Sequence, residues 1–235
     1  MRVASLVPSA TESLRALGVE PIACTRFCEQ PDLPTVGGTK DPDVDALVAR
    51  RPDLVVVNDE ENRREDADAL VAAGLRLYSM SPRSVEDVGP AVAALARAVG
   101  VDVPAPFDPA GWRAWIDGQR APVSRRCAVL LWRRPWTTLR SDTYGSSLLA
   151  LLGFENVFAD MPDRYPTTTL EDLSARRPDV VLLPNEPYPF KARHVPPVEA
   201  AAPGARVALV DGRDLFWWGT RTPAAIEHLR AALRS

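Results

Sequence analysis

The sequence predicts an α/β fold made of two similar halves. An octapeptide recurs almost unchanged, as ARRPDLVV at 49–56 and ARRPDVVL at 175–182, and a turn with a glutamate follows each copy, Glu60 or Glu186. Both copies also lie in the same pattern of a short amphipathic helix, a proline that ends it and a buried strand. In sheets built from such units, ligand groups come from the turns at the carboxyl ends of the strands. We therefore expect both glutamate turns to face one cleft between two lobes.

Residues 1–95 are predicted to form the first α/β lobe, in which strands and helices alternate. Ser9 and Glu12 have the spacing of a capping box, so we expect a helix that begins there and that Gly18 ends. Asn62 is expected to cap a later helix, with Glu65 at its third position. The predicted strands cover 3–7, 22–25, 54–57 and 75–78, and the helices cover 9–17, 44–50, 63–73 and 84–99.

A proline-rich break separates the two lobes. Pro104, Pro106 and Pro109 interrupt the chain before a helical segment at 111–120, so residues 96–124 are predicted to be a helical connection. The second lobe, 125–235, begins with an apolar strand, as the first does. Its predicted strands cover 127–132, 180–183 and 207–210, and its helices cover 146–153, 170–176 and 223–233.

Length and charge restrict the class of protein. A chain of 235 residues can bury enough apolar surface to fold without disulfides or metal. Its formal net charge of −3 gives no general attraction to nucleic acid or to an anionic membrane, so neither is an expected partner. The longest apolar runs fit buried parallel strands and are too short for a membrane span.

The start of the chain and its cysteines bear on its compartment. A strand candidate begins at residue 2, which leaves no room for a secretory leader. Cys24, Cys28 and Cys127 leave at least one thiol unpaired, as in a reducing compartment. We therefore expect a cytoplasmic protein if Met1 is the native start, and otherwise an exported protein associated with the cell envelope.

Seven short motifs occur in the predicted turns, and their order is more specific than any one of them. They are PSATE at 8, TRFC at 25, GGTK at 37, EENR at 60, WRRPW at 132, NEPYPFK at 185, and DG followed by WWGTR at 211–221. Over nearly its whole length the chain resembles the helical-backbone metal receptor group, within the class III ABC-transporter solute-binding proteins for cobalamin and iron-siderophore chelates. The resemblance implies two Rossmann-like lobes joined by a rigid helical backbone. It also implies a chelate clamped between the lobes with little hinge motion and without a required cofactor.

Two departures from this group concern transport. Secreted members carry a leader or a lipid-anchor cysteine, and they present one acidic residue on each lobe to the permease. Glu65 is the candidate for the first docking acid, whereas the matching positions around LFWWGTR, at 215–221, are aromatic. The expected partner is thus a small-molecule metal chelate, an ABC permease partner stays open, and we expect a monomer.

In the first lobe, the predicted ligand-binding residues are Arg26, Lys40, Glu60, Glu61 and Arg63. Lys40 and Lys191 are the two lysines among 28 basic residues. An ammonium is not interchangeable with a guanidinium at a ligand, so their place in candidate turns favours a function. Glu60 and Glu61 follow an apolar strand at the edge where ligands collect. The alternative is a solvated acidic turn that pairs with Arg63 and Arg64.

Aromatic and cationic residues concentrate in the turns of the second lobe. Such rings can hold a large planar or apolar ligand, and arginine can pair with carboxylates or stack on rings. The alternative is that the rings pack within their lobe. The predicted ligand-binding residues here are Trp132, Arg133, Trp136, Glu186, Tyr188, Trp217, Trp218 and Arg221.

Cysteine and histidine leave the metal ligands open. Cys28 near Arg26 has the setting of a thiolate nucleophile or metal ligand, and the alternative is a buried, inert cysteine. Cys24 and Cys28 supply two sulfurs, which do not complete a zinc site. His194 is the histidine candidate for a metal ligand because it follows PYPFKAR, whereas His228 is expected at the surface of a terminal helix.

The sequence lacks the motifs of common enzymes: there is no G-x-S-x-G elbow, Walker loop, H-E-x-x-H or G-x-G-x-x-G. The leading hypothesis is therefore non-enzymatic binding of a siderophore-like or corrinoid metal chelate by groups of both lobes. One alternative is an intracellular enzyme that modifies or demetallates such a chelate by acid-base or thiol chemistry. Another is a ligand-responsive interaction protein without a transport partner.

Overall fold

The computed structural model describes residues 1–233, which divide into two compact units. The first unit comprises Met1–Pro82, Glu86–Arg113 and Trp218–Arg221, and the second comprises Arg83–Val85, Ala114–Trp217 and the residues from Thr222 on. These limits differ from the predicted 1–95, 96–124 and 125–235. The predicted connection is divided between the units, and a short segment late in the chain joins the first unit.

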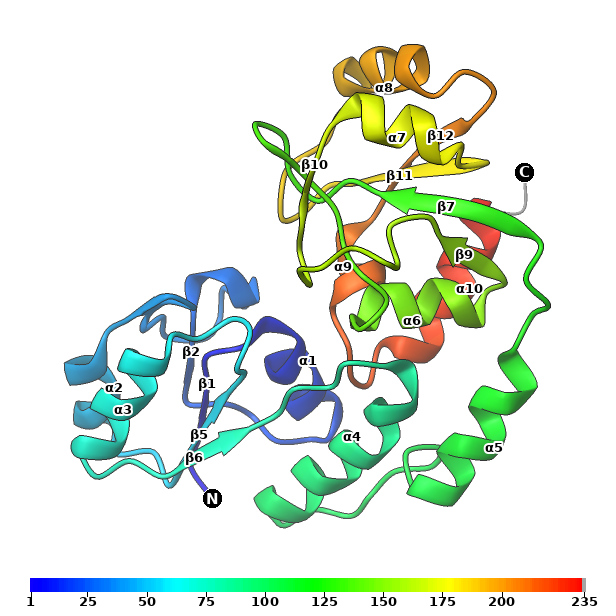
Figure 1. The fold of residues 1–235 in the computed structure, drawn as a ribbon. Coiled ribbons are helices and arrows are strands. Elements are labelled where there is room, and N and C mark those ends of the chain that lie inside the picture. Colours follow the sequence, from blue (N-terminus) through cyan, green and yellow to red (C-terminus); the bar gives the residue numbers. More distant parts are fainter. Residues whose placement is uncertain (234–235) are drawn as a thin grey trace. The chain divides into compact units, whose positions relative to one another are not determined.

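The first unit contains a parallel four-stranded sheet in the order β2-β1-β5-β6. Its strands are β1 (Val3–Ser5), β2 (Ala23–Cys24), β5 (Leu54–Val57) and β6 (Leu77–Ser79). Helices α2 (Val44–Arg50) and α3 (Arg64–Ala72) cover one face, and α1 (Pro8–Ala16) covers the other (Figure 1). The unit also contains the turn η1 (Arg26–Cys28), the hairpin of β3 (Gly37–Gly38) and β4 (Asp41–Pro42), and most of α4 (Val85–Val99).

The second unit contains a matching parallel sheet in the order β9-β7-β11-β12. Its strands are β7 (Arg125–Val129), β9 (Phe154–Asn156), β11 (Val180–Pro184) and β12 (Arg206–Val210). Helices α7 (Leu170–Arg176) and α8 (Val195–Ala201) lie on one face, and α6 (Tyr144–Leu151) and α10 (Thr222–Leu233) lie on the other (Figure 1). Its other elements are the turn η2 (Ala192–His194), α9 (Gly212–Phe216), the antiparallel pair β8 (Trp136–Thr137) and β10 (Thr167–Thr168), and part of α5 (Pro109–Gln119).

The two sheets are equivalent strand by strand, which confirms the predicted duplication. β1 corresponds to β7 and β5 to β11, because β1 pairs with β5 in the same register as β7 pairs with β11. The Arg-Pro-Asp segment of each repeat is held by the same kind of hydrogen bond. The backbone N–H of Arg2 donates to Asp53, and that of Arg126 donates to Asp179, both at 2.7 Å. The glutamate turns after β5 and β11 therefore lie at equivalent ends of equivalent strands, as predicted.

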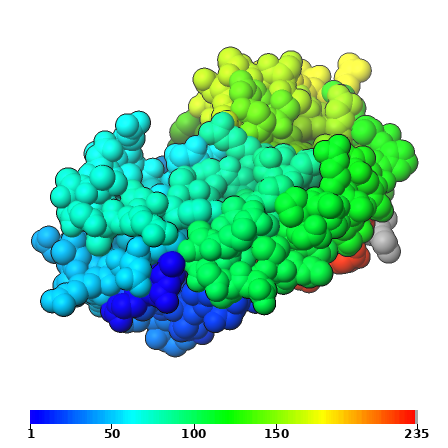
Figure 2. Space-filling model, turned by 90° about the horizontal axis from the view of Figure 1, so that it is seen from below, coloured from blue at the N-terminus to red at the C-terminus, as the bar shows by residue number. Residues whose placement is uncertain are grey.

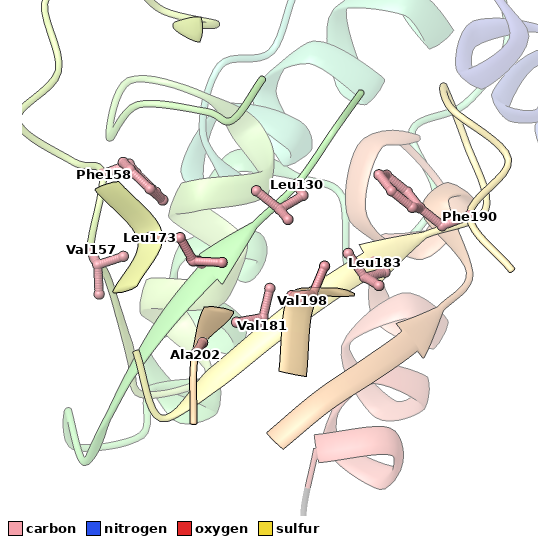
Figure 3. Packing of buried hydrophobic residues seen from close by; sticks show 10 residues of the cluster. Leu130, Val157, Phe158, Leu173, Val181, Leu183, Phe190, Val198 and Ala202 are labelled. Carbon is pink, nitrogen blue, oxygen red and sulfur yellow. The ribbon is translucent and has the colours of Figure 1, made fainter. Parts of the chain in front are cut away.

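Each unit has its own apolar core. In the second unit, Leu130, which follows β7, and Val181 of β11 pack against Leu173 of α7 and Val198 of α8 (Figure 3). The start of the chain lies at the surface (Figure 2, dark blue), and Met1 is 61% exposed. No helix within residues 1–233 has both the length and the apolar character that a membrane crossing requires.

Two helices begin differently from the prediction. α1 begins at Pro8 without a side-chain cap and includes Ser9. Proline suits the first helical position, because the backbone N–H that it lacks would have no partner there. α3 begins after Arg63, also without a side-chain cap. The predicted capping roles of Ser9 with Glu12 and of Asn62 are therefore wrong.

Candidate functional site

Two amide side chains join the turns at the carboxyl edge of the first sheet. Asn62 Oδ1 accepts a hydrogen bond from the Asn58 backbone N–H at 2.8 Å, and Asn62 Nδ2 donates to the Thr39 carbonyl at 2.8 Å. Asn58 is 4% exposed, and its Nδ2 donates to the Met80 carbonyl at 2.9 Å. These bonds fix the turn after β5 against the β3–β4 hairpin. Asn62 thus positions the sheet edge and does not cap a helix.

Arg26 and Lys40 both lie at the β3–β4 hairpin. Lys40 is exposed in its turn, and Arg26 pairs with Asp41 at 2.9 Å. The guanidinium carbon of Arg26 lies 4.9 Å from the centroid of the Phe27 ring. A Cβ at Gly38 would meet Asp41 Oδ1 first and then this guanidinium, so the ion pair lies directly over the glycine. Phe27, which is 50% exposed, adds a ring that the sequence reasoning missed.

The turn after β5 carries Glu60, Glu61 and Arg63. Glu60 is exposed and Glu61 is partly buried, and their backbone N–H groups donate to Asn58 Oδ1 at 2.8 and 3.0 Å. Arg63 Nε lies 2.8 Å from Asp66 Oδ2 in an exposed pair. The charge of Arg63 is therefore balanced by an acid of α3, which is a different partner from the Glu60 and Glu61 of the solvated-turn alternative.

Trp218 and Arg221 belong to the first unit, although the sequence placed them in the second lobe. Arg221 Nε lies 3.3 Å from Glu12 Oε2, and 18% of the Arg221 side chain is exposed. The Thr220 backbone N–H donates to Ser13 Oγ at 3.2 Å. Glu12 is thus an ion-pair partner that holds the segment Trp218–Arg221 against α1.

Four of the residues predicted for the second lobe come together. The Trp132 ring lies edge-on to Tyr188 with centroids 5.4 Å apart, and the Trp136 ring is stacked on Phe190 at 6.1 Å. Tyr188 and Phe190 lie 4.7 Å apart, and the Arg133 guanidinium lies 5.8 Å from the Trp136 ring. We call the rings of Trp132, Trp136, Tyr188 and Phe190 the aromatic cluster. Phe190 is 4% exposed and anchors it, whereas Trp132 is 44% exposed and presents a ring to the surface.

His194 packs against the aromatic cluster and is 3% exposed. Its ring centroid lies 5.5 and 5.6 Å from those of two cluster rings. Nδ1 lies 3.0 Å from the Lys191 backbone nitrogen, and Nε2 lies 3.3 Å from Arg193 Nε. Each ring nitrogen thus faces an N–H donor. Burial first, and then the charges of Arg193, Arg133 and Lys191, lower the pKa of His194. This geometry packs the histidine ring against the aromatic cluster.

The neutral His194 predicts a pH dependence of stability. The unfolded chain takes up the histidine proton near the ordinary value of about 6.5, whereas the folded chain takes it up only at lower pH. The stability that neutral His194 contributes is therefore present above a pH of about 6.5 and is lost as the pH falls below it. Urea unfolding of wild type and of His194→Gln, compared at pH 7.5 and pH 5, should show the larger loss in wild type. Equal losses in the two proteins would contradict this environment.

The start of α9 positions Glu186 and Trp217. The Gly212 backbone N–H donates to Asn185 Oδ1 at 2.7 Å, and a side chain at Gly212 would clash with the Glu186 backbone. The Arg213 guanidinium lies 5.9 Å from the centroid of the Trp217 ring. Glu186 therefore lies against α9 and is partly buried.

All three cysteines are buried, and none forms a disulfide. Cys28 Sγ lies 3.2 Å from both Thr11 Oγ1 and Thr25 Oγ1. The hydrogen bond from Cys24 lowers the pKa of Cys28, burial opposes this, and the threonine bonds lower it further. The structure confirms the buried alternative for Cys28, because its sulfur is covered whatever its charge.

The described side chains suit non-covalent binding. Within residues 1–233, no three His, Cys, Asp or Glu side chains come together as a metal site requires. The second unit offers ring surfaces with cations beside them, and the first offers a rigid edge with Lys40, two glutamates and Phe27. Rings contact planar faces and cations contact carboxylates, which is the chemistry of a recognition surface.

Comparison with known proteins gives both sequence and structural relatives. No family model matches the chain. A vitamin B12-binding protein of Yersinia pestis (strain Pestoides F) is 26% identical over 192 residues, 77% of this chain and 69% of that protein. The periplasmic vitamin B12 binding protein of Vibrio cholerae has a TM-score of 0.77 at 20% identity, covering 99% of this chain and 96% of that one. The periplasmic heme binding protein of the same organism has a TM-score of 0.83 at 20% identity, covering 100% and 99%.

These comparisons confirm the predicted fold, two α/β lobes of the class III periplasmic-binding-protein type. They also confirm the predicted resemblance, because the sequence relatives and structural neighbours are chelate-binding proteins of the class III solute-binding type.

Proposed function

We propose that this chain, with relatives and structural neighbours of the class III solute-binding type, binds a metal chelate and releases it unchanged. The proposal is supported by its similarity to a vitamin B12-binding protein and by the fold that it shares with vitamin B12- and heme-binding proteins. The ligand is a corrinoid, a heme or a siderophore-like complex. The chain acts as a carrier in uptake or handling of that chelate, and an ABC permease is the class of partner that the resemblance implies.

The observation that carries the proposal is the aromatic cluster with its exposed member. Trp132 stands edge-on to Tyr188 while remaining 44% exposed, and Arg133 lies beside the neighbouring ring of Trp136. A ring held in place by other rings offers contact area at little cost in conformational entropy. A large planar ligand with polar substituents fits such a surface. The enzymatic alternative is not favoured, because the relatives named above are binding proteins.

The same neighbours bear on the compartment. The two Vibrio cholerae proteins are periplasmic, which supports the exported alternative and gives no support to the cytoplasmic expectation. We therefore propose that the protein works outside the cytoplasmic membrane as a carrier.

Calorimetric titration with three probes tests the proposed function. Cyanocobalamin, iron protoporphyrin and a ferric hydroxamate complex represent the three classes of chelate. We expect saturable binding of at least one probe at micromolar or lower concentration, with no binding of the metal-free hydroxamate. Failure of all three probes to bind the purified chain would contradict the proposal.

A further inference from the structure

Positive charge is distributed differently over the two units. In the first unit, Arg26 pairs with Asp41 at 2.9 Å and Arg63 pairs with Asp66 at 2.8 Å, so neighbouring acids balance both arginines. The turn after β5 adds further carboxylates next to Arg63. The sequence had predicted that cations of both lobes hold an anionic chelate. The first unit instead presents as much acid as base at its sheet edge.

The second unit gathers three cations around the aromatic cluster. Arg133 lies 5.8 Å from the Trp136 ring, and Arg193 Nε lies 3.3 Å from His194 Nε2. Lys191 follows Phe190 directly in the chain, and both Lys191 and Arg193 are exposed. Within residues 1–233, none of these three cations forms an ion pair with a carboxylate. Their charge is therefore available to a ligand that lies on the rings.

The buried ring of His194 lies close to all three cations. Besides burial, Arg193, Arg133 and Lys191 each lower its pKa, so three cations act on one buried ring. They come from two separate segments, Arg133 from the turn after β7, and Lys191 and Arg193 from the start of η2. Because His194 packs on Tyr188 and Tyr188 packs on Trp132, the cations and the ring surface form one patch.

We infer that Arg133, Lys191 and Arg193 form an anion-binding site beside Trp132 and Tyr188, which takes the carboxylates of a planar chelate while the rings contact its face. The inference rests on the proposed function and names the ligand class within it. That class is a metallated macrocycle with free carboxylates, in preference to one whose edge carries neutral amides. The anionic edge of the ligand is assigned to the second unit.

The test compares iron protoporphyrin, which has two carboxylates, with its dimethyl ester in the same detergent buffer. Arg133→Gln and Lys191→Gln should each weaken binding of the free acid about tenfold, the loss of roughly one charge-assisted contact. Neither should change binding of the ester. Arg125→Gln is the matched control, because Arg125 also lies over an aromatic ring, 5.8 Å from Phe154, but at the amino end of β7. It should bind the acid as wild type does.

The outcomes separate this inference from the proposed function. Wild type that binds acid and ester equally, or variants at 133 and 191 that bind the acid like wild type, would overturn the anion site and leave the carrier function standing. Wild type that binds neither porphyrin but binds cyanocobalamin would also overturn it. Wild type that binds none of these probes and no ferric hydroxamate complex would overturn the proposed function and the anion site together.

Discussion

Replacing Gly219 by alanine is expected to lower the free energy of unfolding by about 2–4 kcal/mol. Gly219 has φ +112°, a conformation that L side chains rarely adopt, and an added Cβ would clash with Ser13 Oγ. That hydroxyl cannot easily move away, because it donates to the Ser9 carbonyl at 2.8 Å and accepts from Thr220 N–H at 3.2 Å. Urea unfolding followed by tryptophan fluorescence measures the loss.

Gly118→Ala is the control for this prediction. Gly118 lies inside α5, and an added Cβ there would meet nothing within 4 Å. Alanine should therefore raise the free energy of unfolding by about 0.5–1 kcal/mol, because it restricts the unfolded chain and favours the helix. A Gly219→Ala protein as stable as wild type would show that the segment Trp218–Arg221 is not held against α1 as described.

Replacing Trp132 by alanine is expected to weaken chelate binding by about 2 kcal/mol, or about 30-fold, with little change in stability. The ring is 44% exposed, so its removal leaves the core of the second unit intact while deleting the surface on which the ligand lies. Calorimetry and thermal unfolding of the same samples separate the two effects.

Two further variants define the role of Trp132. Trp132→Phe should retain most of the affinity, since a smaller ring keeps the aromatic face. Leu209→Ala removes another exposed apolar side chain, 46% exposed on the edge strand β12, and should bind like wild type. Unchanged affinity in Trp132→Ala would exclude the aromatic cluster from the site.

Much of the fold could be predicted because the chain repeats itself. Helices 44–50 and 170–176 and strand 54–57 have the predicted bounds, since an amphipathic period, a proline and an apolar run define them locally. The short strands β3, β4, β8, β9 and β10 were missed. They consist of two or three residues each and are stabilised by pairing with distant segments or across a tight turn, which no local pattern reports.

The site could be predicted only in part, because side-chain partners depend on tertiary contacts. Trp132 and Tyr188 were expected at the ligand, and the structure brings them together from turns that follow different strands. Glu12 has the spacing of a helix cap, yet it pairs with Arg221, more than two hundred residues further along the chain. Phe27 carried no sequence signal beyond its position after a strand.

The measurement that tests the central claim most directly is native mass spectrometry of the wild-type chain incubated overnight with iron protoporphyrin or cyanocobalamin. Binding without chemistry predicts a complex whose mass is that of the chain plus one intact metallated ligand. It also predicts that the ligand released by denaturation has an unchanged mass and still holds its metal. Recovery of a metal-free or cleaved ligand would contradict the account and make this chain an enzyme, and recovery of the chain alone with every chelate offered would contradict chelate binding itself.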